Sequence, residues 1–143
     1  MLTKLLGLCI FVMLSAVLTA CSSERTRAID NGDVVHVNGS VYNFSIFETF
    51  IDNLHNKQES YIRILTYTDE GEPLHYNLEY KESNLMLEID YSKDKLRGSV
   101  PDKLLCKDLL IKKELQSKTY SLLNCDSPSS DSFELFRVYE MID

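Results

Sequence analysis

The sequence predicts an α+β fold: one amphipathic helix packed on an antiparallel sheet of about five to six strands, with one disulfide. The prediction rests on two observations. Apolar residues recur with a helical period in one segment, residues 45–56. Later segments instead alternate apolar and polar residues, which is the pattern of half-buried strands. One helix beside several antiparallel strands is an α+β layer arrangement.

The helix is expected over residues 45–56, because its apolar residues share one face. Ser45 and Glu48 have the spacing of a capping box at the helix start. Before the helix, Asn38-Gly39 is typical of a tight hairpin turn between two short strands. The apolar helix positions are Ile46, Phe47, Phe50, Ile51 and Leu54, and the two hairpin segments are Val34–Val37 and Val41–Tyr42.

Three strands are expected to follow the helix as a meander. Residues 61–68 are rich in β-branched and aromatic side chains, which favour strands. Residues 74–80 and 85–91 alternate apolar and polar side chains, with polar turns between the runs. Residues 133–138 are expected to form a closing strand.

Residues 104–114 fit an amphipathic helix almost as well as a strand. We favour the strand because a hairpin with its tip at Leu115-Gln116 places Cys106 opposite Cys125. Directly opposed residues of antiparallel strands lie about 4.5–5.5 Å apart at Cα, within reach of a disulfide. The same register pairs Leu109 with Leu122 and Ile111 with Tyr120.

The N-terminus predicts export and lipidation. Lys4 precedes an apolar run over residues 5–17, which suits a signal peptide and is shorter than the roughly 20 residues of a membrane span. The run ends in Leu18-Thr19-Ala20-Cys21, the layout of a bacterial lipobox. We expect residues 1–20 to be a signal peptide, and Cys21 to carry a diacylglycerol, with palmitate among its acyl chains. This lipid would hold the protein at the extracytoplasmic face of the cell membrane. A buried helix or an uncleaved anchor would leave Cys21 unexplained.

Removal of this leader leaves 123 of the 143 residues, enough for a single domain. Residues 21–32 are polar and are expected to form a lipidated flexible tether, followed by one extracytoplasmic domain over residues 33–143. The leader contains one charged residue, Lys4, so 14 basic and 22 acidic residues remain, a net charge of −8. Anionic headgroups repel such a surface, and nucleic-acid binding needs a basic patch. The lipid is therefore the expected membrane contact.

Two cysteines remain once the signal peptide removes Cys9 and lipidation uses Cys21. In an oxidising compartment, Cys106 and Cys125 most simply form a disulfide, which would contribute about 3 kcal/mol in the chain-entropy model. A redox-active or metal-binding pair would need a CxxC spacing or a nearby histidine.

Several short motifs occur together between Asp33 and Cys125. They are Asp33-Val34-Val35 followed by Asn38-Gly39, the helix residues Phe47, Phe50 and Ile51, Ile62-Arg63-Ile64 leading into residues 66–73, residues 90–95 followed by Gly98, and the cysteines Cys106 and Cys125. With these motifs the chain resembles a family of small Gram-positive lipoproteins catalogued only as a domain of unknown function, number 4362. The Tyr-Thr-x-Glu-Gly-x-Pro turn is the most specific motif. The resemblance implies an exported, lipid-anchored domain with one disulfide, and it implies no activity.

The sequence predicts no catalytic, cofactor-binding or metal-binding set. Ser92 and Lys95 match an S-x-x-K motif, but the S-D-N and K-T-G elements that accompany it in penicillin-recognising enzymes are missing. The histidines His36, His55 and His75 are widely spaced along the chain, and a metal site would need them to converge.

Five residues are candidates for an interaction surface. Tyrosine suits contact surfaces, and Tyr61 and Tyr67 lie in the expected meander. Asp69, Glu70 and Glu72 crowd one turn, without the ligand spacing of an EF-hand loop. Each candidate surface has an alternative interpretation. A helix could cover the face that bears the tyrosines, and the acidic turn could be solvated without binding anything.

These observations favour a membrane-anchored, non-enzymatic binding or interaction module, whose partner is an unknown protein or envelope ligand. One alternative is an envelope hydrolase with an unrecognised active site. Another is an inhibitor or immunity-like protein, which the small fold permits.

Overall fold

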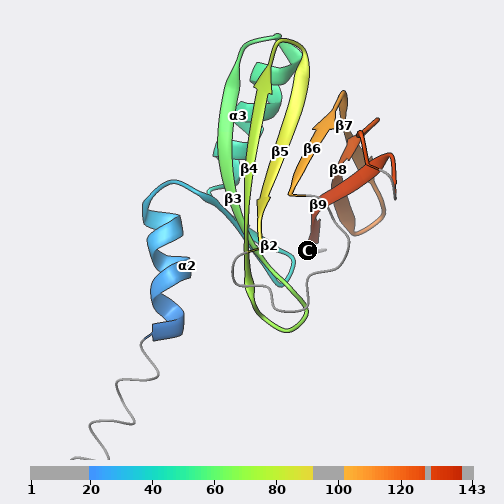
Figure 1. The fold of residues 1–143 in the computed structure, drawn as a ribbon. Helices are drawn as coiled ribbons and strands as arrows, with labels where there is room; N and C mark the ends of the chain where they lie inside the picture. Colours follow the sequence, from blue (N-terminus) through green and yellow to red (C-terminus); the bar gives the residue numbers. More distant parts are fainter. Residues whose placement is uncertain (1–19, 92–101, 128–129, 140–143) are drawn as a thin grey trace, which may run out of the picture.

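The computed structural model describes residues 20–91, 102–127 and 130–139, with side chains from Glu24 onward. Residues 1–19 of the expected signal peptide and the S-x-x-K motif lie outside these ranges. The α+β class is confirmed, but the single helix and the single sheet were wrong, because the described residues form two helices and two sheets (Figure 1). The elements are α2 (Ala20–Asp30), β1 (Val34–Val37), β2 (Ser40–Tyr42), α3 (Phe44–His55), β3 (Ser60–Tyr67), β4 (Pro73–Lys81), β5 (Asn84–Asp90), β6 (Lys103–Cys106), β7 (Asp108–Lys113), β8 (Ser117–Leu123) and β9 (Ser132–Tyr139).

The larger sheet has six strands in the order β2-β1-β3-β4-β5-β6. Strands β3 to β6 are antiparallel neighbours, and the expected meander is confirmed. Strand β1 pairs with β3 in parallel, with Val34 beside Ile64, so the sheet is not purely antiparallel. The parallel pairing arises because α3 connects the β1–β2 hairpin to β3. Asn38 and Gly39 form the hairpin turn with positive φ angles of 50° and 78°, as their sequence predicts.

The smaller sheet contains β7, β8 and β9. The favoured strand over residues 104–114 is extended, but it divides at Lys107, so β6 belongs to the larger sheet and β7 to the smaller one. The expected register is confirmed, since Leu109 pairs with Leu122 and Ile111 with Tyr120.

The predicted disulfide between Cys106 and Cys125 is present, with a Cα–Cα distance of 4.0 Å. Its setting differs from the prediction, because Cys106 pairs with Leu85 in the larger sheet rather than across the β7–β8 hairpin. The bridge therefore ties β6 to the segment that follows β8. Asp126 supports the same junction: its backbone N–H donates to the Leu105 carbonyl at 3.0 Å, and its Oδ1 accepts from the Leu105 N–H at 2.6 Å.

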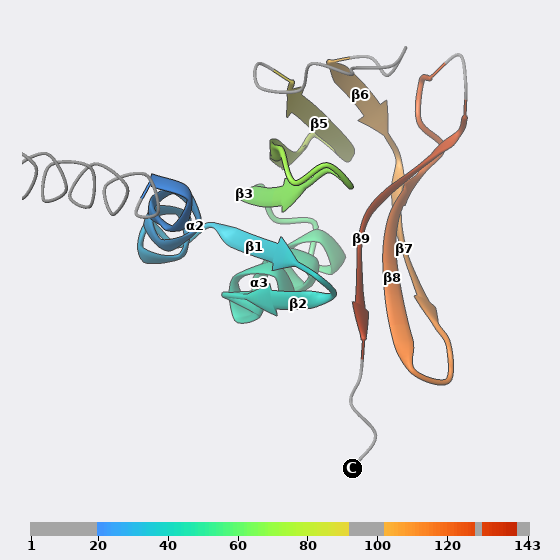
Figure 2. The ribbon, with the colours of Figure 1, turned by 90° about the horizontal axis from the view of Figure 1, so that it is seen from below.

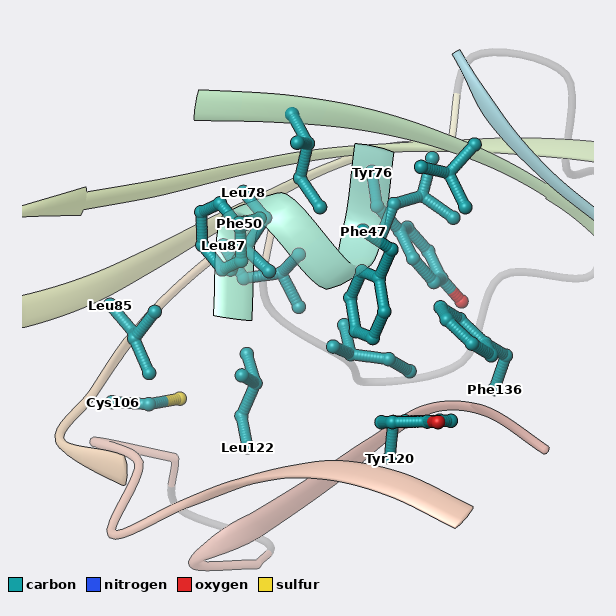
Figure 3. Packing of buried hydrophobic residues seen from close by; sticks show 14 of the residues in the cluster. Phe47, Phe50, Tyr76, Leu78, Leu85, Leu87, Cys106, Tyr120, Leu122 and Phe136 are labelled. Atoms are coloured by element: carbon teal, nitrogen blue, oxygen red, sulfur yellow. The ribbon is translucent and has the colours of Figure 1, made fainter. Parts of the chain in front are cut away.

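The hydrophobic core joins both sheets and α3 (Figure 3). Figure 2 shows β7–β9 standing across from the larger sheet, and α3 packs against β3 and β1 of that sheet. The ring of Phe47 lies 5.1 Å from that of Tyr120 and 4.8 Å from that of Phe136, centroid to centroid. We call the core-facing side of the larger sheet its inner face and the opposite side its outer face. The inner face includes Ile62, Ile64, Tyr76, Leu78, Leu85, Leu87, Ile89 and Leu104.

Helix α3 begins differently from the expected capping box. Asn43 precedes it with a φ of 55°, and no side chain caps the helix start. The Asn43 amide instead donates to the carbonyls of Ile29 at 2.8 Å and Asp33 at 2.9 Å. These bonds fasten the start of α3 to the end of α2 and to the loop that follows α2.

Part of the expected flexible tether is helical. Helix α2 covers Ala20–Asp30, and its Ala28 is buried against Val35 and Leu65 on the outer face. An ion pair of 2.6 Å between Arg63 and Asp33 lies near the end of this helix. Among the residues that the structure describes, neither helix has the length and apolar character that a membrane crossing requires.

Candidate binding groove

A groove of about 1100 Å³ lies where the β1–β2 hairpin, the β3–β4 turn and strand β9 meet. These segments are distant in the sequence, and two hydrogen bonds bring β9 to the hairpin. One runs from the Tyr139 backbone N–H to the Gly39 carbonyl at 3.3 Å. The other involves His36. The groove is thus a product of the tertiary fold, because only the fold brings these segments together.

His36 links β1, β3 and β9 at this site. Its Nε2 donates to the Arg137 carbonyl at 3.0 Å, and in the neutral ring its Nδ1 accepts from the Thr66 hydroxyl at 3.2 Å. Its ring stacks on that of Phe136 at 5.6 Å. Burial lowers the pKa of His36, opposed by the bond to Arg137 and by the charge of Glu134. The imidazole is therefore a neutral structural link with both nitrogens engaged.

Gly39 is held closely by the end of β9. The Tyr139 ring packs over it, and a Cβ added to Gly39 would lie 2.3 Å from the Tyr139 Cδ2. The φ of Gly39 is also positive, at 78°, a conformation that glycine adopts without strain. Both the turn and the contact with β9 thus require glycine here.

The acidic turn forms another wall of the groove. The Thr68 N–H donates to the Glu72 carbonyl at 2.9 Å, the Gly71 N–H donates to the Thr68 carbonyl at 2.8 Å, and the Thr68 hydroxyl accepts from the Glu72 N–H at 3.1 Å. Asp69 and Gly71 line the groove, whereas Glu70 and Glu72 belong to the same turn without lining it.

The two candidate tyrosines have different surroundings. Tyr67 lines the groove and packs at the edge of the small cluster formed by Ala28 and Leu65. Tyr61 is 56% exposed on the outer face, and its hydroxyl donates to Asn77 Oδ1 at 2.9 Å. Helix α2 therefore covers one part of the tyrosine-bearing face and leaves Tyr61 open to solvent.

The groove has charges of both signs. Arg25 lies at its rim, over the Tyr42 ring at 5.9 Å. Glu134 and Arg137 of β9 also line it and pair with each other at 3.5 Å. The groove therefore shows no strong preference for one sign of charge.

The three histidines do not converge. His36 bonds Thr66 on the inner face, whereas His75 contacts Glu24 of α2 at 3.2 Å on the outer face. His55 lies in the last turn of α3. Across residues 24–91, 102–127 and 130–139, no group of three or more His, Cys, Asp or Glu side chains could hold a metal ion.

Residues 31–121 match the family described as Domain of unknown function (DUF4362). The chain belongs to the DUF4362 family. The DUF4362 match includes the β1–β2 hairpin, α3 and the β3–β4 turn, and it ends within β8. Two walls of the groove therefore lie inside the DUF4362 region, and the β9 wall follows it. Neither the comparison with curated proteins nor that with solved structures found a match.

The sequence indicated some of this site and missed the rest. Tyr67 and Asp69 were candidates and do line the groove. The roles of His36 and Tyr139 were missed, because each depends on a contact with a distant strand. The signal for the hairpin wall was Asn38-Gly39, and nothing local in β9 indicated that it would reach this turn.

Proposed function

We propose that this DUF4362 protein is a membrane-anchored extracytoplasmic lipoprotein that works as a non-enzymatic binding module. Its anchor is the lipid on Cys21, and its binding site is the groove between the β1–β2 hairpin, the β3–β4 turn and β9. The lipobox at Cys21 supports the anchor. The disulfide between Cys106 and Cys125 accords with an oxidising compartment.

The observation that carries the binding proposal is the construction of the groove. It is concave, open to solvent, and lined by aromatic and polar groups that come from separate segments. Such pockets are the usual location of ligand or partner binding. His36 and Gly39 fix the walls relative to each other, so that the groove is formed before a ligand arrives.

An envelope hydrolase has less support from this geometry. General acid–base chemistry needs a titratable group within reach of a substrate proton. Thr66 and the Arg137 carbonyl occupy both nitrogens of His36, and the Arg137 side chain pairs with Glu134, so two of the titratable groups that line the groove already have partners. An inhibitor or immunity-like role would be a special case of binding.

The test is retention of envelope or secreted material by an immobilised form containing residues 22–143. Asp69→Arg changes an exposed charge that lines the groove, and Glu70→Arg makes the matching change one residue outside it. We expect saturable retention by the wild type and Glu70→Arg, and loss of it in Asp69→Arg. Equal retention by both variants, or no saturable retention by the wild type, would contradict the proposal.

A further inference from the structure

The β7–β8 hairpin ends in an unusually exposed apolar residue. Leu115, at its tip, is 92% exposed, and Leu110 on β7 is 44% exposed. The register places Tyr139 opposite Ser117, next to the tip, and Tyr139 is 60% exposed. Three apolar or aromatic side chains thus face solvent on the hairpin and its immediate neighbour.

The same tip is basic in an acidic protein. Lys112, Lys113 and Lys118 flank the turn, and Glu114 is the acidic residue among them, so residues 112–118 have a net charge of +2. The whole chain has a net charge of −7. Glu114 is held by Lys112 at 2.8 Å, and this hydrogen bond lowers the pKa of its carboxyl.

The lysines are arranged on both faces of the hairpin. Lys113 and Lys118 are directly opposed across the strands, a like-charge pair that is unfavourable by itself. They border a cleft that also includes Glu48 and Asp52 of α3, which offset part of this charge. Lys112 is on the other face, where it pairs with Glu114, so lysines lie near Leu115 on both faces of the hairpin.

We infer that the β7–β8 tip is a second membrane contact, which places Leu115 among the headgroups of an anionic bilayer. At a membrane surface, the aliphatic stems of lysines pack along apolar groups while their ammonium groups reach the lipid phosphates. Tyrosine is enriched at the same depth of the bilayer. The hairpin tip matches this composition, because Leu115 lies between lysines in the sequence and Tyr139 is opposite Ser117, two residues from Leu115. The contact shares Tyr139 with the groove, whereas Leu115 and the lysines lie outside it, and it would orient a protein that is already tethered near a membrane.

A depth measurement tests this inference independently of lipidation and of groove binding. The described core lies between Ala28 and Val138, so a protein of residues 22–143 retains it. An N-terminal histidine tag would hold this protein on vesicles that contain a chelating lipid. A polarity-sensitive fluorophore would be attached at Leu115→Cys, with Ser83→Cys on the exposed β4–β5 turn as the control site.

With phosphatidylglycerol in phosphatidylcholine vesicles, we expect the emission at position 115 to shift to shorter wavelength and to be quenched by brominated lipid. The probe at position 83 should show neither effect. Lys112→Gln with Lys113→Gln should weaken the effect at position 115 roughly ten-fold or more, measured as the insertion equilibrium. The inference is overturned if the two probes behave alike, or if removing phosphatidylglycerol or the lysines leaves the signal at position 115 unchanged.

Discussion

The His36 imidazole donates a hydrogen bond of 3.0 Å to the Arg137 carbonyl, across 101 positions of the chain. This bond joins the first strand of the larger sheet to the last strand of the smaller one. Together with the bond from Tyr139 to Gly39, it sets the spacing of the groove walls. The integrity of the proposed binding site therefore depends on a neutral histidine.

Acid should weaken this link. Burial lowers the pKa of His36 below its usual 6.5, so the folded protein binds the proton more weakly than the unfolded chain. The contribution of His36 to stability is therefore full above the unfolded pKa and is lost as the pH falls through the folded pKa. We expect the difference in unfolding free energy between pH 7.5 and pH 5 to be larger in the wild type than in His36→Gln. Urea unfolding measures both values, and identical pH dependence in the two proteins would contradict this role.

Gly39→Ala should destabilise the hairpin. The positive φ alone opposes a Cβ by about 1–2 kcal/mol, and the Tyr139 ring would have to move as well. We expect a smaller loss for the same substitution in a Tyr139→Ala background. Urea unfolding of the single and double variants gives the coupling between the two positions. Full additivity would show that the ring does not restrict position 39.

Loss of the disulfide should destabilise the junction between the sheets. Cys106 and Cys125 are 19 positions apart, and a loop of this length gives about 3 kcal/mol in the chain-entropy model. We expect the Cys106→Ala, Cys125→Ala double variant to unfold at lower urea concentration than the oxidised wild type. Unchanged stability, with an unchanged slope of the unfolding transition, would contradict this expectation.

Phe47→Ala should be among the most damaging core substitutions. Phe47 is fully buried and contacts aromatic rings from both strands β8 and β9, so its removal should cost about 3–5 kcal/mol. Tyr61→Ala is the control, because Tyr61 lies on the exposed outer face and should change stability by about 0.5 kcal/mol or less. Denaturant unfolding measures both changes. Equal losses of unfolding free energy in Phe47→Ala and Tyr61→Ala would contradict the packing described for the core.

Local patterns predicted most strands and one helix correctly. The alternation in β4 and β5 and the turn at Asn38-Gly39 depend on neighbouring residues, which the sequence displays directly. The register of β7 on β8 could also be predicted, because the short hairpin and the cysteine spacing restrict the pairing. The Ser45–Glu48 capping box failed because the helix begins before Ser45, at Phe44, and the preceding Asn43 makes tertiary hydrogen bonds.

The division of residues 104–114 between two sheets could not be predicted. Cys106 is buried against the larger sheet, while Asp108 begins the smaller one, and no breaker residue marks Lys107. The parallel pairing of β1 with β3 and the approach of β9 to Gly39 depend on global packing. Tyr67 and Asp69 could be proposed from their local sequence. His36 could not be assigned to the groove, because its contacts depend on the distant strand β9.

Hydrogen–deuterium exchange on the retained complex tests the binding groove most directly. If material retained by the immobilised protein occupies the groove, amide exchange should slow at the hairpin turn, the β3–β4 turn and the end of β9. Exchange at the β4–β5 turn should not change. Protection confined to other surfaces, with these three segments exchanging as in the free protein, would contradict a binding module built around His36.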